Sequence, residues 1–178
     1  MKSELNAHQK TLLLTLTALL TAVNIIFSSF GIPVPGGHLY LNDTVICLAA
    51  LLLNPVLAFF VGGVGAFLGD LFFYPAPMFV SLVTHGLQAV VISLLVRRRE
   101  GKTRFWLSVV AVTFGVVINV TGYSLGRAFL YSTAEYAWLK LPFQIVQAVF
   151  GAVVSVLLYY VAGVGKRFDK LLSKDKKA

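Results

Sequence analysis

Long apolar segments separated by short polar ones dominate the pattern along this chain. A transmembrane helix needs about 20 apolar residues, and every segment except the second approaches or exceeds that length. Asn54-Pro55 ends the second segment, because proline disfavours helix at the residue before it. We therefore expect an all-α integral membrane protein, a bundle of six transmembrane helices with the second one short. The expected spans are residues 11–30, 42–53, 56–73, 78–96, 105–131 and 139–163.

Composition supports a membrane class for the whole chain. Hydrophobic residues make up 58% and charged residues only 12% of it, against about 25% charged in a soluble domain. We therefore expect residues 1–178 to form a single membrane domain. The first apolar segment has no small-residue cleavage site after it, so we expect a retained span and not a signal peptide. The single cysteine, Cys47, is expected to be a small buried apolar residue.

Lysine and arginine gather before the first span, in residues 97–104 and in a basic tail at 165–178. Cytoplasmic loops carry an excess of these residues. Four expected spans separate the first two clusters and two separate the last two, which places both termini in the cytoplasm. Topology therefore accounts for the net charge of +8. Nucleic-acid binding is disfavoured, because the clusters adjoin span ends without interleaved aromatic residues.

Strongly polar side chains occur at similar depth in several spans. With about 1.5 Å of rise per residue, His85 and Gln88 lie roughly 10 and 15 Å from the outer end of the fourth span. Hydrogen bonds between helices alone could explain any one such residue, but the shared depth predicts a pocket open to the outside. The candidate substrate-binding residues are Tyr40, Asn42, His85, Gln88, Asn119, Tyr123, Arg127, Gln144 and Gln147.

Other polar residues near the outer end have less certain roles. Asn42 and Asp43 are expected at the outer lip, and Asp70 as a structural acceptor for backbone or hydroxyl groups. His38 is either part of a lid or simply exposed. The expected chemistry is neutral amide, imidazole and phenol, with the aromatic residues Tyr40, Tyr74, Tyr123 and Trp138 nearby.

This chemistry suits a small, flat heteroaromatic molecule with hydroxyl groups, bound by stacking and a few directed hydrogen bonds. A multiply charged phosphate would need more cations than Arg127, the one plausible cation.

Small residues on two helices indicate close packing, because they let helix backbones approach in lipid. Gly65 and Gly69 have GxxxG spacing in the third span, where we favour packing inside the bundle. Ala18 and Ala22 form a similar pair in the first span. For that pair an external partner is as plausible as an internal one.

Three features recur together in one known family: Ala18-x-x-x-Ala22, the stretch at residues 38–77 with a short helix and a glycine-rich helix ending in Gly-Asp, and MFVSLVTHGLQAVVISLL after it. In their order and spacing they resemble the substrate-binding S component of an energy-coupling-factor (ECF) vitamin transporter. The resemblance covers residues 11–164. The subgroup it resembles most is the riboflavin-type or the hydroxymethylpyrimidine/pyridoxine-type S component.

The resemblance implies a multi-pass subunit in a bacterial plasma membrane that captures a vitamin at the outer face. It also implies docking through Ala18 and Ala22 on a transmembrane coupling subunit, which two ATPase subunits drive, and toppling of the S component to release the vitamin. The chain has no GxxxxGK[ST] phosphate loop, so we expect no cofactor in this chain and ATP hydrolysis by the partners.

Among vitamins, pyridoxine and hydroxymethylpyrimidine are favoured. Riboflavin would need a larger cavity, and pantothenate would need Arg127 as a carboxylate partner.

Two other functions stay open. An intramembrane enzyme would need a nucleophile–base pair or metal ligands at one depth, and His85 with Asp70 is the only conceivable set. Without an HExxH or GxSxG motif, we expect no enzyme. A self-sufficient transporter would need a polar path through the inner half or an inverted repeat, and the sequence has neither feature.

Overall fold

The computed structural model describes residues 6–96 and 104–173. Within them, five helices are long and apolar enough to cross a membrane, which agrees with an all-α membrane protein. These are α1 (Ala7–Ser29), the continuous run Pro55–Phe73, α5 (Met78–Leu95), the run Phe105–Tyr131, and α7 (Ala134–Tyr160).

The expected second span is helix α2 (Asn42–Leu52), which has 11 residues. At about 1.5 Å per residue it is about 16 Å long, roughly half of a hydrocarbon core of about 30 Å. The length of this helix therefore does not support a sixth complete span.

Two of the long runs contain wider π-helical turns. The run Pro55–Phe73 consists of α3 (Pro55–Phe59), η1 (Phe60–Val64) and α4 (Gly65–Phe73). The run Phe105–Tyr131 consists of α6 (Phe105–Gly126) and η2 (Arg127–Tyr131). Such turns are frequent at functional sites.

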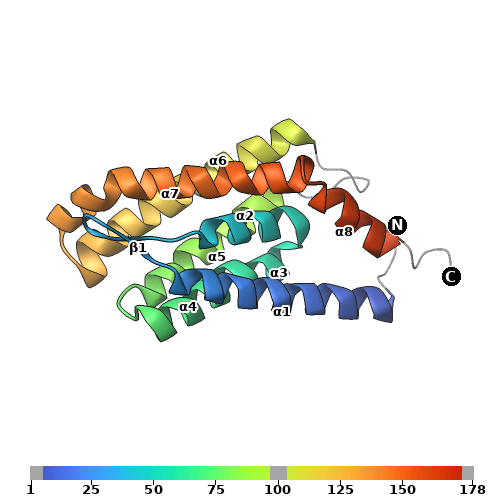
Figure 1. Cartoon of the computed structure of the whole chain (residues 1–178), viewed down its shortest axis with the longest axis horizontal. Coiled ribbons are helices and arrows are strands. Elements are labelled where there is room, and N and C mark those ends of the chain that lie inside the picture. The colour runs from blue at the N-terminus through green and yellow to red at the C-terminus, as the bar shows by residue number, and fades with distance from the viewer. Residues whose placement is uncertain (1–5, 97–103, 174–178) are drawn as a thin grey trace.

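The helices run back and forth along the length of the molecule (Figure 1). Helix α1 begins at one end of the molecule, where the last helix, α8 (Val164–Ser173), also lies. A small β-hairpin lies at the other end. Helix α2 occupies the middle and packs against α1, α5 and α7. The basic cluster expected at residues 97–104 lies, apart from Arg104, outside the described residues.

The hairpin forms in the loop after α1 and was not expected from the sequence. Strands β1 (Ile32–Val34) and β2 (Gly37–Leu39) pair antiparallel. The turn between them contains Gly36, whose φ of 80° is in the region that favours glycine. An added Cβ on Gly36 would lie 3.0 Å from the backbone nitrogen of Lys140. The hairpin therefore packs directly on α7.

Helix α7 begins earlier than the sequence predicts. Residues 132–138 separate two expected spans and were expected to form a loop, but most of them are helical, because the Thr133 hydroxyl accepts a hydrogen bond from the Tyr136 amide and caps a helix that starts at Ala134. Hydropathy misses this first turn because it is more polar than the rest of the span. The expected basic tail also contains α8, whose Phe168 is buried while Lys166 and Arg167 are exposed.

The glycines of the third span pack inside the bundle, as predicted. A Cβ on Gly65 would lie 2.7 Å from Asn24 Nδ2, and a Cβ on Gly69 would lie 2.6 Å from the Ser28 side chain. Both contacts are with α1. Cys47 is fully buried in an apolar cluster, also as predicted.

Candidate ligand-binding site

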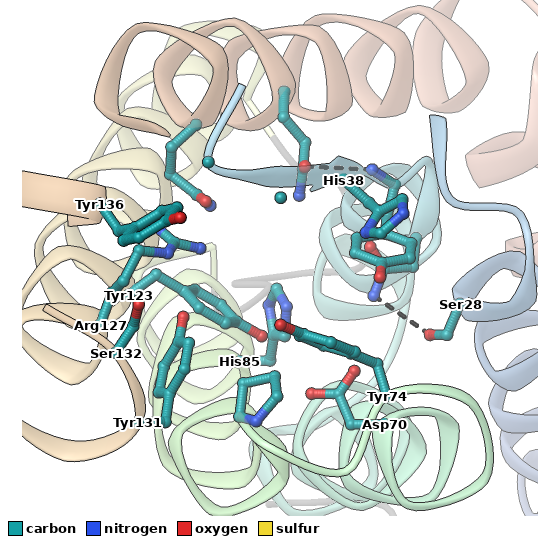
Figure 2. Close-up of a pocket in the computed structure, with 17 residues that line it drawn as sticks. Ser28, His38, Asp70, Tyr74, His85, Tyr123, Arg127, Tyr131, Ser132 and Tyr136 are labelled. Atoms are coloured by element: carbon teal, nitrogen blue, oxygen red, sulfur yellow. Dashed lines mark hydrogen bonds between the residues drawn. The ribbon is translucent and has the colours of Figure 1, made fainter. Parts of the chain in front are cut away.

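A cavity of about 330 Å³ lies at the hairpin end of the bundle. Figure 2 shows His85, Tyr123 and Arg127 directed towards the same space as Asp70 and Tyr74. The hairpin, α2, α4, α5, α6, η2 and α7 all contribute to it. Seven of the nine predicted substrate-binding residues line this cavity: Tyr40, Asn42, His85, Tyr123, Arg127, Gln144 and Gln147.

The other two predicted residues, Gln88 and Asn119, do not line the cavity. Both have 0% exposure and lie behind His85. Gln88 Oε1 is 2.8 Å from His85 Nδ1, and Asn119 Nδ2 donates to Gln88 Oε1 over 3.3 Å. The structure therefore places these two side chains in a layer that supports the cavity residues.

The centre of that layer is Asp43, which is 1% exposed. Its expected position at the outer lip is therefore wrong. Its carboxylate accepts hydrogen bonds from Asn119 Nδ2 over 2.7 Å and from Gln147 Nε2 over 2.8 Å. Gln88 Nε2 donates to it over 3.5 Å, and His85 Nδ1 is 3.7 Å away. Several polar partners thereby compensate the desolvation of a buried carboxylate.

Helix packing explains how Asp43 became buried. A Cβ added to Gly151 of α7 would lie 2.5 Å from the Cβ of Asp43. The absence of a side chain at Gly151 thus lets the first turn of α2 approach α7. The sequence signal was present, an aspartate at the start of an apolar helix, but the neighbour that buries it is far away along the chain.

Asp70 on α4 does line the cavity. Its carboxylate accepts a hydrogen bond from the Ser81 hydroxyl, which also lies within hydrogen-bond distance of the Tyr123 hydroxyl. The prediction that Asp70 accepts from a hydroxyl is confirmed. The expected amide, imidazole and phenol chemistry is incomplete, because this carboxylate also faces the cavity.

Two cations are buried near the cavity, whereas the sequence suggested one. Arg127 is 8% exposed and lines the cavity. Its Nη1 atom is buried without a hydrogen-bond partner among the described residues, and its guanidinium carbon lies 5.7 Å from the centre of the Tyr131 ring. Lys140 is 2% exposed, and its Nζ donates to the His38 carbonyl. Lys140 therefore holds the hairpin against α7.

Tyrosines supply most of the aromatic lining. Tyr131 and Tyr136 were missed, because their segment was assigned to a span end and a loop, while Trp138 is 72% exposed and lies outside the lining. His38, whose role was open, belongs to the lining. The tyrosines of the cavity are Tyr40, Tyr74, Tyr123, Tyr131 and Tyr136.

Tyr40 follows the hairpin and connects it to the polar layer. Its backbone nitrogen donates to Gln147 Oε1 over 3.1 Å. Burial, and after it the negative charge of Asp70, raises the pKa of Tyr40 to about 12. The phenol is therefore protonated at neutral pH and can donate a hydrogen bond to a ligand.

Within residues 6–96 and 104–173 there is no group of three or more His, Cys, Asp or Glu side chains that could hold a metal ion. The donors and acceptors of the cavity, together with its tyrosines, are instead suited to an organic solute.

A multi-pass helix bundle with a buried polar and aromatic cavity at one end is typical of membrane proteins that bind a small organic solute. A family model described as "ECF-type riboflavin transporter, S component" matches residues 8–163. The chain belongs to this family. The sequence is also similar to a Pyrococcus woesei protein described as "Uncharacterized protein in gap 3'region". The two are 31% identical over 153 residues, which cover 85% of this chain and 99% of that protein.

Family membership confirms the resemblance inferred from the sequence. The protein is a multi-pass membrane protein and an ECF-type S component, and vitamin uptake fits the family. S components are transport subunits, so the family is consistent with the prediction that the chain is not an enzyme. The family also implies a vitamin substrate and a complex with a coupling subunit and ATPases.

Proposed function

We propose that this chain captures a vitamin in the cavity at the hairpin end and delivers it across the cell membrane after docking on a coupling module. The observation that carries the proposal is the buried Arg127, whose Nη1 has no hydrogen-bond partner among the described residues although it lies at a cavity of about 330 Å³. A buried donor without a partner is costly, and a bound ligand would supply the acceptor.

The orientation in the membrane follows from charge. Lys10, Arg104 and Lys166 lie in or beside the first turns of α1, α6 and α8, at the end of the bundle away from the hairpin (Figure 1). Because positive residues favour the cytoplasmic side, the cavity opens to the outside and both termini are cytoplasmic. The short α2 completes six segments of alternating direction.

Riboflavin is the first candidate vitamin. The name of the matching family refers to riboflavin, and a cavity of about 330 Å³ falls within the range of about 300–1,000 Å³ for drug-sized ligands. Tyrosines from several helices can stack on a multi-ring system. This ranking differs from the one drawn from sequence, which favoured the smaller pyridoxine and hydroxymethylpyrimidine. Both stay in the test as competitors.

The capture test is a titration of the purified protein in detergent with riboflavin, followed by quenching of flavin fluorescence. We expect a submicromolar Kd and no displacement by pyridoxine or hydroxymethylpyrimidine. Binding of either smaller vitamin without riboflavin binding would overturn the choice of substrate. If none of the three binds, capture of this class of vitamin is overturned.

Docking is proposed for the exposed side of α1, which points away from the bundle. Ala18 and Ala22 are exposed on this helix beside Leu14, which is 61% exposed. Asn24 and Ser28 lie on the opposite side of α1, where they are buried against the bundle. Only 17% of its most apolar window is buried, the smallest share among the five long helices of the described chain. A smooth face of small side chains allows close approach of a partner helix in lipid.

The docking test uses Ala18→Leu in cells that express the coupling module. We expect riboflavin uptake to be lost while the Kd of the purified variant is unchanged, because Leu blocks close approach without touching the cavity. Ala162→Leu is the matched control, since Ala162 is also exposed but lies beyond the end of α7. Full uptake in Ala18→Leu would contradict docking at this face, and uptake without any coupling module would favour a self-sufficient transporter.

A further inference from the structure

The orientation of the amide side chains around Asp43 follows from the chemistry of its carboxylate. An ionised carboxylate only accepts hydrogen bonds, whereas an amide has a donor end and an acceptor end. Asn119 Nδ2 and Gln147 Nε2 donate to Asp43 over 2.7 and 2.8 Å. Each of these two amides must therefore direct its carbonyl oxygen away from Asp43.

The orientation of the Asn119 amide in turn determines the orientation of the Gln144 amide, which lies at the cavity. Asn119 Oδ1 accepts a hydrogen bond from Gln144 Nε2 over 2.7 Å. This bond directs Nε2 of Gln144 towards Asn119, so Oε1 points away from Asn119 and is available as an acceptor for a ligand. Gln144 lines the cavity and thus presents an acceptor there.

A second path runs through Gln88 to His85. Gln88 Nε2 faces Asp43, and its Oε1 accepts from Asn119 Nδ2 over 3.3 Å. This oxygen also lies 2.8 Å from His85 Nδ1, which must then be the donor. In the neutral ring, Nε2 is left as an acceptor. Because His85 also lines the cavity, the neutral form of its ring presents an acceptor there.

Two buried atoms at the cavity complete the pattern. Asn42 Nδ2 donates to Ser28 Oγ over 3.4 Å, while Asn42 Oδ1 is buried without a partner among the described residues. Arg127 Nη1, a donor, is likewise buried without a hydrogen-bond partner among the described residues. Beside the tyrosine hydroxyls, which can donate or accept, the cavity therefore has several acceptors and one buried cationic donor.

We propose that Asp43 is a positioning residue that sets the hydrogen-bonding polarity of the cavity, so that the ligand presents N–H or O–H donors to Gln144 and His85 and an acceptor to Arg127. The inference rests on the proposed function and adds the functional groups by which the vitamin is recognised. Riboflavin fits this pattern, because its ring system carries an N–H between two carbonyl groups.

The test compares riboflavin with 3-methylriboflavin, in which a methyl group replaces the hydrogen of that ring N–H. We expect the wild-type protein to bind the methyl analogue about tenfold or more weakly, because a buried acceptor is left unpaired. Asp43→Asn keeps the size of the side chain, but an amide can donate as well as accept, so the neighbouring amides can reorient. In this variant we expect the ratio of the two dissociation constants to fall close to one.

Two matched variants separate orientation from other effects. Asp70→Asn changes a carboxylate that lines the cavity but bonds to Ser81 and not to the amide cluster. It is expected to keep the ratio even if both affinities change. Asp169→Asn in α8 is expected to leave both affinities unchanged. Thermal unfolding in detergent establishes that each variant is folded.

Failure of the inference is distinguishable from failure of the proposed function. A wild-type protein that binds no riboflavin overturns the choice of riboflavin in the proposed function. A wild-type protein that binds both flavins equally, or an Asp43→Asn protein that still discriminates between them, overturns the inference. If Asp43→Asn does not fold, Gln144→Leu and His85→Leu replace it, and discrimination that survives in both overturns the inference.

Discussion

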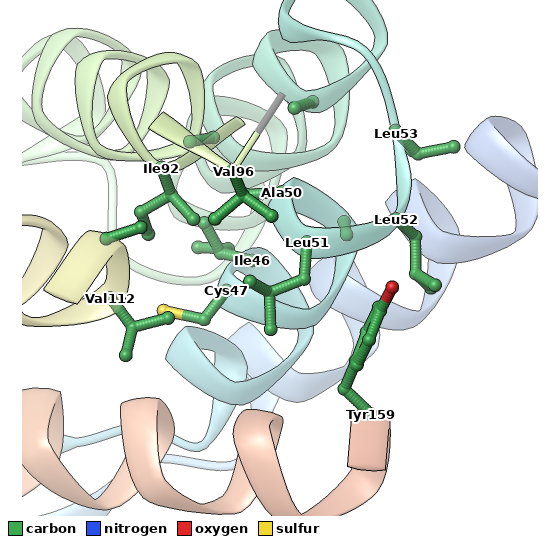
Figure 3. Packing of buried hydrophobic residues seen from close by; sticks show 14 of the residues in the cluster. Ile46, Cys47, Ala50, Leu51, Leu52, Leu53, Ile92, Val96, Val112 and Tyr159 are labelled. Carbon is green, nitrogen blue, oxygen red and sulfur yellow. The ribbon is translucent and has the colours of Figure 1, made fainter. Parts of the chain in front are cut away.

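The two ends of α2 lie in regions that are equally buried, but one region is polar and the other is apolar. Its first turn carries Asp43 in the polar layer behind the cavity, while Ile46 and Leu51 belong to an apolar cluster with residues of α5, α6 and α7 (Figure 3). Ile46 and Asp43 are 0% and 1% exposed. Burial alone therefore does not distinguish the site from the scaffold. The difference is direction, because the hydrophobic effect is non-directional, whereas a hydrogen bond requires the donor to be aligned with the acceptor.

Unsatisfied polar atoms further separate the two regions. Three of the buried side-chain atoms without a partner in the described residues belong to cavity residues: Asn42 Oδ1, Arg127 Nη1 and Tyr131 OH. None of the residues in the apolar cluster contributes such an atom. The apolar end thus stabilises the fold, while the cavity end retains unmet hydrogen-bonding capacity that a ligand can use.

The largest expected effect on stability is in the apolar region. Ile92 on α5 is 0% exposed, and Ile92→Ala should cost about 2–5 kcal/mol of unfolding free energy, because a cavity replaces well-packed atoms. Thermal and denaturant unfolding in detergent would measure it. Leu94→Ala on the same helix, where the side chain is 50% exposed, should cost far less. A loss of ligand affinity without a loss of stability would break the proposed division between the two regions.

The reverse outcome is expected at the cavity. Arg127→Met should weaken riboflavin binding by more than tenfold, since a hydrogen bond to a charged group contributes about 1.5–3 kcal/mol. The melting temperature without ligand should stay the same or rise, because the variant no longer buries an unpaired donor. Arg104→Met, an exposed arginine just before α6, should change neither quantity. A clear drop in melting temperature would instead assign Arg127 a structural role.

The smallest effect is expected where a polar residue serves packing alone. Asn24 of α1 donates from Nδ2 to the Val61 carbonyl of η1 over 2.6 Å. Hydrogen bonds between membrane helices contribute about 0.6 kcal/mol on average, so Asn24→Ala should lower stability slightly and leave the Kd for riboflavin unchanged. The exposed Ser29→Ala on the same helix is the control for the unfolding measurement. A changed Kd would extend the binding region to the packing of α1.

Much of the helical layout could be predicted, because the lengths of apolar segments and the residues that break them are local properties. The expected span at residues 105–131 coincides with α6 and η2, and the expected short segment at 42–53 coincides closely with α2. The shared depth of the polar side chains predicted the cavity end, because the helical rise per residue is constant. The amino-acid sequence alone therefore assigns Tyr123, Arg127 and Gln144 to one region of the bundle.

The arrangement within that region was decided by tertiary structure. Sequence periodicity indicates which residues share a helix face but not how each helix is rotated or how closely two helices approach. The contact of Gly151 with Asp43 brings together residues that are far apart along the chain, and it determines that Asp43 lies behind the cavity with Gln88 and Asn119. A hydrogen bond needs both partners in place, so the direction of each amide is fixed only when the helices pack together.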